Sequence, residues 1–443
     1  MLPSKHFWIM DLGFRKMTLF LSDLLALYVS LGVTIFIGYF GEFDVDLYVS
    51  HAIPFSFLYL IWLTILYVFD LYDLSVPMTS APFLRRWVGA LALLLGTGIT
   101  FFYAFPFLGI SPKTNLAIHV AVFGLLAYLA RRSFLKHASV WSIGLLDLSP
   151  EESREMERII HAYRHQGYTC ASLGEEGSDL PTMIQQHRVH VVILPRSMFS
   201  NKDRVAQMYQ SLGTGVVFLD LPAAYEMFAR RIPVDSIDER WFLQYLQLPS
   251  QRSFVALKRF MDICGAFVLL VFTSPFWFII AVLIKVTDSG PVFYRQQRIG
   301  QHRERFSIIK FRTMRMDAEA QGVQWASKQD TRVTRVGAFL RRTHLDELPQ
   351  MLNVLKGELS LVGPRPERPE FVNQLEVEIP HYRARHFIKP GFTGWAQIKF
   401  RYARSVEDSK TKFEYDLYYI KNRSAIMDVL ILLKTIQLFF RHA

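Results

Sequence analysis

Four long apolar segments near the start of this chain constrain its fold more than any other feature. They cover residues 17–40, 52–69, 87–110 and 114–130. The only charged residue within them is Asp23. A helix needs about 20 apolar residues to cross a bilayer. Four such segments so close together are not typical of the buried helices of a soluble protein. The pattern predicts a four-helix transmembrane bundle over residues 1–136.

The charges beside these segments indicate their orientation. Basic residues stand at 15–16 before the first segment, at 85–86 before the third and between 131 and 136 after the fourth. The loop at 42–46 is acidic. Because basic loops stay in the cytoplasm, both ends of the bundle are predicted to be cytoplasmic. No cleavable signal peptide is evident, so we expect a multi-pass membrane protein.

The composition of the chain favours some classes of binding partner over others. Its net charge is +11, and 51% of its residues are apolar. Since the basic residues lie among membrane-grade apolar segments, anionic headgroups or phosphate substrates are favoured, and nucleic acid is not. The two cysteines, Cys170 and Cys264, are far apart and show no metal-binding spacing. We therefore expect no disulfide framework and soluble parts that face a reducing cytosol.

Residues 137–247 have an α/β pattern. Buried strands are predicted at 140–148, 189–195 and 216–220, with polar helices at 151–166 and 201–212. Strands that alternate with helices indicate a parallel sheet. The segment from Gly144 to Pro150 lacks the glycine-rich turn that binds a pyrophosphate. We predict a Rossmann-like cytosolic module without nucleotide binding, followed by a linker at 230–250. Its role as a regulatory, oligomerising or structural module stays open, and so does a homodimer.

A further apolar segment at 263–284 has basic residues on both sides. Ser274 and Pro275 lie near its middle. Proline removes a backbone donor and bends a helix, and a serine hydroxyl can bond the carbonyl that is freed. We predict a re-entrant membrane helix over 256–287, broken at Ser274 and Pro275, and keep a kinked spanning helix as the alternative. The segment at 425–440 is predicted to be an interfacial helix, with a fifth transmembrane helix as its alternative.

Asp346 and Glu347 form the candidate catalytic centre. They follow a pair of arginines and precede Pro349, which suits the first turn of a helix that ends at Gly357. A helix N-terminus is electropositive, so this setting is expected to keep an aspartate ionised and to attract phosphate. An isolated pair of this kind would only cap a helix. The rest of the chain decides between these interpretations.

Seven motifs follow one another after residue 252. They are Lys258-Arg259-Phe260-Met261-Asp262, Ser274-Pro275, Gly290-Pro291-Val292-Phe293-Tyr294-Arg295-Gln296, Ile309-Lys310-Phe311-Arg312-Thr313-Met314, Leu345-Asp346-Glu347-Leu348-Pro349-Gln350, Val362-Gly363-Pro364-Arg365-Pro366 and Lys389-Pro390-Gly391-Phe392-Thr393-Gly394-Trp395-Ala396-Gln397. Their order resembles the bacterial sugar transferases, which are monotopic phosphoglycosyl transferases, also called polyprenyl-phosphate hexose-1-phosphate transferases. The resemblance implies an α/β catalytic domain over 248–443, and the whole chain resembles the large members of the family. Residues 400–408 and 415–419 resemble the exopolysaccharide-initiating subgroup.

The resemblance implies a reaction. A UDP-sugar gives its sugar-1-phosphate to undecaprenyl phosphate and UMP leaves, at the start of exopolysaccharide or related glycan assembly. In the family the aspartate of the Asp-Glu pair is the nucleophile, which here is Asp346, and an aspartyl-phosphosugar intermediate forms. Glu347 and Asp346 are expected to hold Mg²⁺, because several anionic groups converge there. The implied location is the bacterial inner (cytoplasmic) membrane, with the catalytic domain on its cytoplasmic face.

Five basic residues are the candidates for substrate binding. Arg341, Arg365 and Arg401 match family arginines, and guanidinium groups suit bidentate contacts with phosphate. Lys310 and Arg312 are added to them, with contact to lipid headgroups or solvation of a strand edge as their alternatives.

Several points stay open at this stage. Residues 398–400 depart from the pattern of many relatives, so the identity of the sugar is not carried over. His344 is expected to be structural, because attack on a phosphoanhydride needs little proton transfer. Two other functions compete with the transferase: a non-catalytic membrane scaffold for polysaccharide assembly, and a glycosyl transferase that releases UDP in place of UMP.

Overall fold

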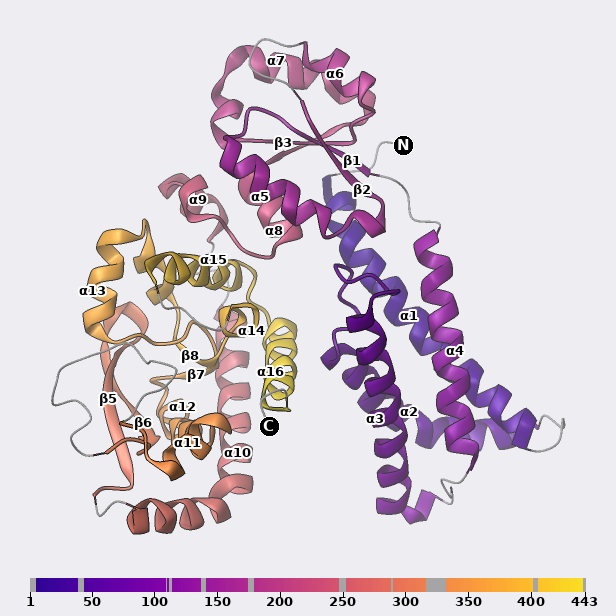
Figure 1. Cartoon of the computed structure of the whole chain (residues 1–443), viewed down its shortest axis with the longest axis vertical. Coiled ribbons are helices and arrows are strands. Elements are labelled where there is room, and N and C mark those ends of the chain that lie inside the picture. The colour runs from indigo at the N-terminus through magenta and orange to yellow at the C-terminus, as the bar shows by residue number, and fades with distance from the viewer. Residues whose placement is uncertain are drawn as a thin grey trace. The chain divides into compact units, whose positions relative to one another are not determined.

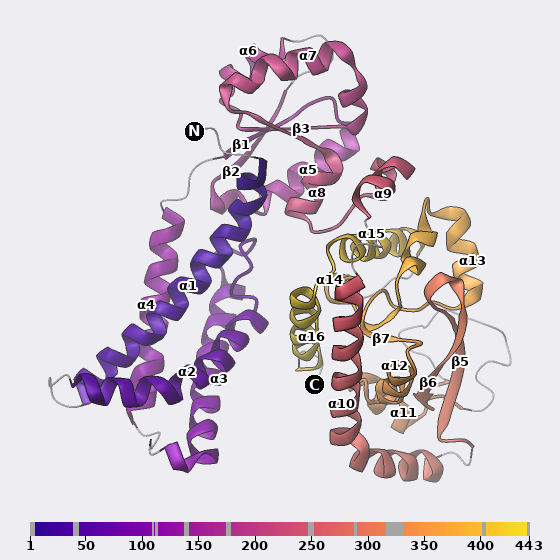
Figure 2. The ribbon, with the colours of Figure 1, turned by 180° about the vertical axis from the view of Figure 1, so that it is seen from behind.

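The computed structural model describes the chain at residues 5–38, 44–108, 110, 114–136, 141–173, 179–246, 252–287, 290–315, 332–400 and 405–440. The chain divides into two compact units, Met1–Phe228 and Ala229–Ala443 (Figures 1 and 2). Helices predominate in the first unit, and the second combines helices with short strands. The three domain ranges predicted from the sequence remain predictions.

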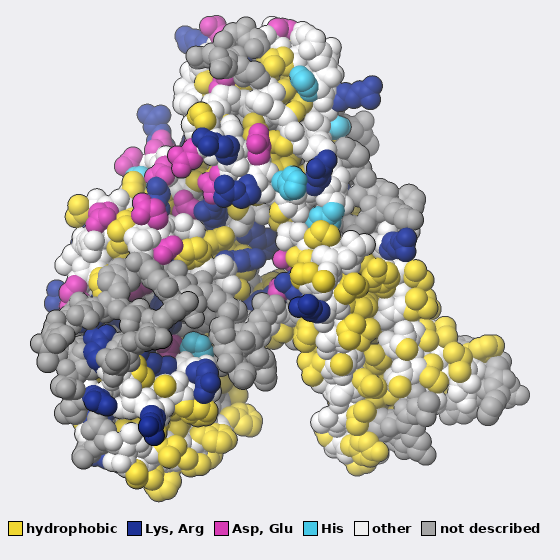
Figure 3. Space-filling model, in the orientation of Figure 1, with side chains coloured by type: hydrophobic (Ala, Val, Ile, Leu, Met, Phe, Trp, Pro, Cys, Tyr) yellow, Lys and Arg dark blue, Asp and Glu magenta, His cyan; other side chains and the backbone are white. Residues whose placement is uncertain are grey.

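The first unit begins with four long apolar helices. They are α1 (Lys5–Gly38), α2 (Val45–Val68), α3 (Ala81–Ala104) and α4 (Thr114–Lys136), with the short 3-10 helix η1 (Pro106–Leu108) after α3. All four are long and apolar enough to cross a membrane, as predicted. Their outer faces expose large apolar side chains such as Leu25, Ile53 and Leu60. Figure 3 shows apolar side chains gathered over these helices, an arrangement that suits lipid better than water.

Polar groups inside these helices bond to one another. Asp23 on α1 pairs with Arg131 on α4, and both side chains are buried. Nδ1 of His119 lies 3.0 Å from the Ser30 hydroxyl, and its Nε2 lies 3.1 Å from the Tyr59 hydroxyl. Because an unpaired polar group costs several kcal/mol in an apolar environment, these bonds specify how the helices meet.

A four-stranded parallel sheet follows the helices. Its strands are β1 (Trp141–Leu145), β2 (Tyr168–Ser172), β3 (Val191–Leu194) and β4 (Val217–Asp220), in the order β2-β1-β3-β4. Around them lie α5 (Pro150–His161), α6 (Leu180–Gln186), α7 (Lys202–Ser211), α8 (Leu221–Phe228) and the 3-10 helices η2 (Arg164–Gln166), η3 (Arg196–Ser200) and η4 (Leu212–Thr214). The three predicted strands are confirmed. β2 was missed because only Tyr168 is buried in it, so it shows no apolar run.

The second unit carries the motifs. Its long helix is α10 (Arg252–Thr287), its hairpin is β5 (Phe293–Ile299) with β6 (Arg305–Phe311), and its parallel pair is β7 (Ser360–Val362) with β8 (Gly391–Thr393). The other helices are α9 (Glu239–Tyr245), α11 (Arg335–Arg342), α12 (Met351–Lys356), α13 (Pro369–Glu378), α14 (Trp395–Lys399), α15 (Val406–Asn422), α16 (Ala425–Phe440) and the 3-10 helices η5 (Val234–Ser236), η7 (Gln301–Arg303), η8 (Leu345–Gln350) and η9 (Tyr382–Phe387). The helix predicted at 425–440 is confirmed.

Helix α10 bends sharply in both ribbon views (Figures 1 and 2). Pro275 lies inside it, and the Ser274 hydroxyl donates to the carbonyl of Val271 at 3.0 Å. Val271 is the residue whose carbonyl an amide at position 275 would otherwise bond. The serine therefore satisfies the acceptor that the proline leaves open, as predicted. By length and composition α10 is the fifth helix, among the described residues, that is able to span a membrane.

Both halves of α10 rest on the second unit. In the first half Asp262 accepts bonds from the Ser360 hydroxyl (3.0 Å) and from the backbone N–H of Leu361 (2.9 Å). In the second half Ile280 and Ile284 are buried in a cluster with residues of β6 and α11. Elsewhere both halves expose large apolar side chains. The unit thus carries an apolar surface along the whole of a bent helix.

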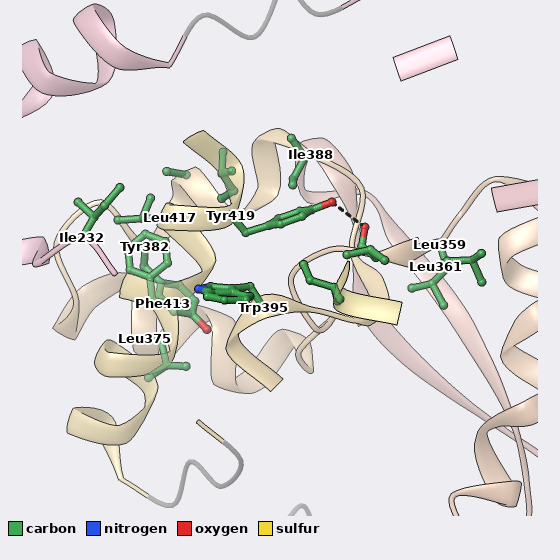
Figure 4. Packing of buried hydrophobic residues seen from close by; sticks show 14 of the residues in the cluster. Ile232, Leu359, Leu361, Leu375, Tyr382, Ile388, Trp395, Phe413, Leu417 and Tyr419 are labelled. Atoms are coloured by element: carbon green, nitrogen blue, oxygen red, sulfur yellow. Dashed lines mark hydrogen bonds between the residues drawn. The ribbon is translucent and has the colours of Figure 1, made fainter. Parts of the chain in front are cut away.

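The prediction of a linker at 230–250 is wrong for its described part. Ile232, Val234 and Trp241 are all buried in the main core of the second unit. Figure 4 shows Ile232 packed beside Leu417 and Tyr382. We call residues 229–246 the strap. Its apolar residues are too few and too widely spaced to be read as a core element from the sequence, because their partners lie far along the chain.

Candidate active site

The carboxylate pair lies on a tight turn between two helices. Helix α11 ends at Arg342, and His344 then takes a left-handed conformation (φ 53°) that redirects the chain into η8. Asp346 and Glu347 lie on this 3-10 helix, and α12 follows it and ends at Gly357, as predicted. The pair therefore lies in the first turn of a short helix, as predicted, and the N-cap of that helix is His344.

Glu347 is bonded by two cations. Its Oε1 lies 2.8 Å from Nζ of Lys310 and 2.5 Å from Nη2 of Arg365, and its Oε2 lies 3.3 Å from Nη1 of Arg365. Burial alone would raise the pKa of Glu347, but Arg365 and Lys310 hold that pKa well below its usual range. Arg365 and Lys310 therefore favour the ionised form of Glu347.

Asp346 is in a different state although it is adjacent. No hydrogen bond or ion pair to its carboxylate exists within the described part of the chain. Burial, and next the charge of Glu347, raise the pKa of Asp346 to about 6 against the attraction of Lys310 and Arg341. The expectation that the local helix keeps this aspartate fully ionised is thus corrected, because desolvation outweighs the helix field. A carboxylate of this kind is more basic than an ordinary aspartate.

The structure brings some of the predicted basic residues to the pair and leaves others apart. Lys310 and Arg365 bond Glu347, whereas Arg341 donates through Nε to the Thr313 hydroxyl at 2.9 Å and reaches Asp346 only through its electrostatic field. Arg312 is buried beside β6, and its backbone N–H donates to the carbonyl of Val292 at 2.9 Å. Arg401 lies outside the described residues.

A charged cluster next to Arg365, in part fully buried, was not predicted. It joins Arg298, Glu367, Arg385, Lys412 and Asp416. Each of these residues stands in a stretch of sequence that looks like ordinary amphipathic surface. The partners come from β5, η9, α15 and the segment after β7, which are far apart in the sequence. Asp416 lies in the 415–419 motif, which was the only signal available. Burial raises the pKa of Asp416 to about 6, whereas the surrounding cations, Lys412 first, lower that of Glu367 to about 2 despite its burial.

The donors for a metal ion are few. Among the described residues there is no group of three or more His, Cys, Asp or Glu side chains suited to hold one. Asp346 and Glu347 are adjacent carboxylates, and Mg²⁺ is commonly held by one or two carboxylates together with substrate phosphates. The pair therefore fits Mg²⁺ only in company with a bound diphosphate.

Comparison with known proteins places this site in a family. The profile of a family described as bacterial sugar transferase matches residues 253–442. The chain is 44% identical over 212 residues to a UDP-N-acetylgalactosamine-undecaprenyl-phosphate N-acetylgalactosaminephosphotransferase of Aeromonas hydrophila, a match that covers 48% of this chain and 49% of that protein. It is 44% identical over 185 residues to a UDP-glucose:undecaprenyl-phosphate glucose-1-phosphate transferase of Xanthomonas campestris pv. campestris, covering 41% and 38% of the two.

A shorter relative is covered almost completely. An exopolysaccharide production protein of Rhizobium leguminosarum bv. phaseoli is 40% identical over 191 residues, which are 41% of this chain and 94% of that protein. The long apolar helices indicate a membrane protein. Asp346 and Glu347 lie within residues 253–442, which the family profile matches. The chain belongs to the bacterial sugar transferase family. It spans about half, or less, of the length of the first two relatives.

Proposed function

We propose that the chain transfers a sugar-1-phosphate from a UDP-sugar to undecaprenyl phosphate, releases UMP and so starts the assembly of an exopolysaccharide or related glycan. The asymmetry of the carboxylate pair carries this proposal. Glu347 is neutralised by two cations, whereas Asp346 beside it is bonded by no cation of the described residues and has a raised pKa. A basic carboxylate next to phosphate-binding cations suits nucleophilic attack on phosphorus. The names of the relatives in Aeromonas and Xanthomonas support the same chemistry.

The reaction divides into two displacements. In the first, an Oδ atom of Asp346 forms a bond to the phosphorus that carries the sugar. The bond from that phosphorus to the bridging oxygen breaks, and UMP leaves with the electron pair. In the second, a phosphate oxygen of undecaprenyl phosphate attacks the same phosphorus, and Asp346 is released as a carboxylate. Lys310 and Arg365 offset the charge that the approaching diphosphate adds.

Mg²⁺ completes the proposed site. Asp346 and Glu347 would hold it, and the ion would neutralise the diphosphate and the leaving phosphate. Glu347 is already preorganised as an ionised carboxylate by Arg365 and Lys310. Those two cations balance its charge before the substrate arrives, and they remain in place to contact phosphate oxygens afterwards.

The bent helix α10 suits an acceptor that stays in the membrane. Because both of its halves pack on the same unit, we propose that it enters one leaflet and returns, which is the re-entrant arrangement. The polyprenyl chain then remains in lipid while its phosphate reaches Asp346, and the large cost of exposing that chain to water is avoided. Single cysteines at Ser253 and Val286, in a chain without Cys170 and Cys264, test this. Labelling of both only from the cytoplasmic side is expected, and periplasmic labelling of one would indicate a spanning helix.

The finer architecture of the first unit belongs to the same proposal. We take α1–α4 to be a transmembrane bundle with cytoplasmic ends and the β2-β1-β3-β4 sheet to be a Rossmann-like module. The parallel order of the strands and the absence of glycine from positions 145–150 support a module of this kind that does not bind a dinucleotide.

Product analysis tests the function. The purified protein in lipid nanodiscs is mixed with a panel of UDP-sugars, with and without undecaprenyl phosphate. The proposal expects one sugar to give continued release of UMP when the polyprenyl phosphate is present, and no more than one UMP for each enzyme molecule when it is absent. Release of UDP would indicate a glycosyl transferase, and no nucleotide release with any sugar would favour a scaffold. Removal of Mg²⁺ by a chelator is expected to stop the reaction.

A further inference from the structure

The segment that carries Arg365 is held along its backbone by donors from other elements. Each carbonyl oxygen from 364 to 367 accepts a hydrogen bond. Gly391 N–H donates to the Pro364 carbonyl at 2.9 Å, and Ile299 N–H donates to the Glu367 carbonyl at 3.0 Å. The two ends of the segment are thereby fixed to β8 and to β5, on either side of the active-site arginine.

Two arginine side chains bond the carbonyls in between. Nη2 of Arg385 lies 2.9 Å from the carbonyl oxygen of Arg365, and Nη1 of Arg298 lies 3.1 Å from that of Pro366. Two of the four residues in the segment are prolines, whose φ angles are fixed by their rings. The backbone of Arg365 therefore has little freedom left.

Arg385 is itself locked by buried partners. The same Nη2 atom donates to Oδ2 of Asp416 at 3.1 Å, and Nη1 donates to the Tyr382 hydroxyl. The side chains of Arg385 and Asp416 are only 4% and 2% exposed. A buried ion pair seldom stabilises a protein more than apolar side chains of similar volume would. A carbonyl oxygen, moreover, needs only a neutral donor. Stability alone thus gives no reason for a charged pair at this place.

The other end of Arg365 lies in the site. Its guanidinium bonds both oxygens of Glu347, yet its side chain remains 35% exposed. One edge of the guanidinium is thus fixed on Glu347 while the rest stays accessible to a ligand. The direction in which that accessible edge points depends on where the backbone of Arg365 is held.

We propose that Arg385 and Asp416 are positioning residues, which aim Arg365 at the transferred phosphate through its backbone carbonyl. This inference rests on the proposed function, in which Arg365 stabilises charge on that phosphate. The pair acts on the transition state more than on substrate binding, because phosphate contacts are most sensitive to geometry when the phosphorus is being transferred.

Steady-state kinetics of the full-length protein in nanodiscs test the proposal. Arg385→Lys keeps the charge but loses the fork that reaches both Asp416 and the Arg365 carbonyl. We expect kcat to fall by about 10–100-fold, since a displacement of about 1 Å can cost about 100-fold, while KM for both substrates changes by less than about threefold. Asp416→Asn should have the same pattern. A rise in KM without a fall in kcat, in either variant, would contradict the proposal.

A double-mutant cycle separates positioning from a merely structural role. The second substitution is Arg365→Lys, which leaves a measurable rate but removes the group to be aimed. If Arg385 acts through Arg365, Arg385→Lys lowers kcat by less than about threefold in that background. An equal loss of kcat in both backgrounds would overturn the proposal. Full activity of Arg365→Lys itself would instead count against the role that the proposed function gives to Arg365.

The chain offers a matched control. Arg303 and Glu376 form another Arg–carboxylate pair at 3.1 Å in the same unit, and this pair is more exposed than Arg385 and Asp416. Arg303→Lys should leave kcat within about twofold. If Arg385→Lys does not fold, Tyr382→Phe removes one bond of Arg385 with less disturbance and should give a smaller loss with the same dependence on Arg365. Independence from Arg365 would again overturn the proposal.

Discussion

Two buried aspartates, one in each unit, differ in whether a cation of the described residues bonds them. Asp23 is fully buried among the apolar helices and pairs with Arg131. Arg131 also donates to the carbonyl of Leu71 at 2.7 Å and lies over the ring of Tyr72. Asp346 is almost as deeply buried, yet no cation bonds it within the described residues, and Lys310 and Arg365 bond Glu347 instead.

The difference separates a structural charge from a functional one. A buried carboxylate with its own cation is satisfied in the folded protein, and it ties together the elements that carry the two charges. A buried carboxylate without one destabilises the fold when it ionises, so it persists where a ligand or a reaction requires it. By this criterion we interpret Asp23 as a structural residue of the first unit, and Asp346 as a residue that is free to meet the proposed substrate.

The largest effect is expected from Asp346→Asn. The amide is nearly isosteric but is not a nucleophile, so turnover should fall by more than about 1,000-fold. Because the folded protein holds the Asp346 proton more tightly than the unfolded chain does, ionisation at neutral pH opposes folding. The variant should therefore be more stable by about 2–3 kcal/mol at pH 7, measured by thermal unfolding in detergent. A destabilised variant that keeps its turnover would give Asp346 the structural role of Asp23.

Trp241→Ala is expected to have the reverse profile. Trp241 is 2% exposed in the core of the second unit, whereas Leu243 on the same helix is 83% exposed. Truncation of a buried tryptophan costs about 3–5 kcal/mol, while Leu243→Ala should change stability by less than about 0.5 kcal/mol. Specific activity per folded molecule should stay within about threefold. A Trp241→Ala protein as stable as Leu243→Ala would show that the strap is a linker after all.

Asp23→Asn should lower the stability of the first unit without changing the rate of transfer by the folded protein. The substitution leaves Arg131 buried without its counter-charge, which we expect to cost about 3 kcal/mol in a titration with denaturing detergent. Asp203→Asn, at an exposed position of α7, is the control and should have almost no effect. If Asp23→Asn stops transfer in molecules that remain folded, the contrast between the two aspartates fails, and the first unit takes part in the reaction.

The pH dependence of kcat/KM is the smallest effect. Since we propose that Asp346 attacks as a carboxylate, and its pKa is raised to about 6, activity should fall as the pH drops through 6. Burial also raises the pKa of Asp416 to about 6, so a second proton can steepen this fall. In the Asp416→Asn variant, the slope of log(kcat/KM) against pH on the acidic side should be close to one. A flat profile between about pH 7.5 and 5 would mean that Asp346 is not the group that titrates.

The sequence predicted those parts whose pattern is local. The apolar helices α1–α4 and helix α16 were found because runs of apolar residues report burial or lipid directly. The bond from Ser274 to Val271 followed from the chemistry of Pro275 alone. The ordered motifs predicted the carboxylate pair, and Lys310 and Arg365, which were predicted to bind substrate, both bond Glu347.

The rest depended on contacts between distant residues. Ile232 and Trp241 are core residues only because α15 and η9 lie against them, so the strap looked like a linker. The pKa of Asp346 is raised by burial and by the charge of Glu347, while Lys310 and Arg365 bond Glu347. Neither the burial nor these bonds can be read from the sequence. Arg385 and Asp416 were missed for the same reason, since no local pattern pairs them.

Mass spectrometry of the enzyme with nucleotide-sugar alone tests the central claim most directly. The protein is mixed with its UDP-sugar in the presence of Mg²⁺ and in the absence of undecaprenyl phosphate, then quenched and digested. We expect a sugar-phosphate adduct on the peptide that holds Asp346, one UMP released for each adduct, and loss of the adduct when undecaprenyl phosphate is added. No adduct should form on Asp346→Asn. Transfer to undecaprenyl phosphate by an enzyme that never carries the adduct would contradict the covalent role of Asp346.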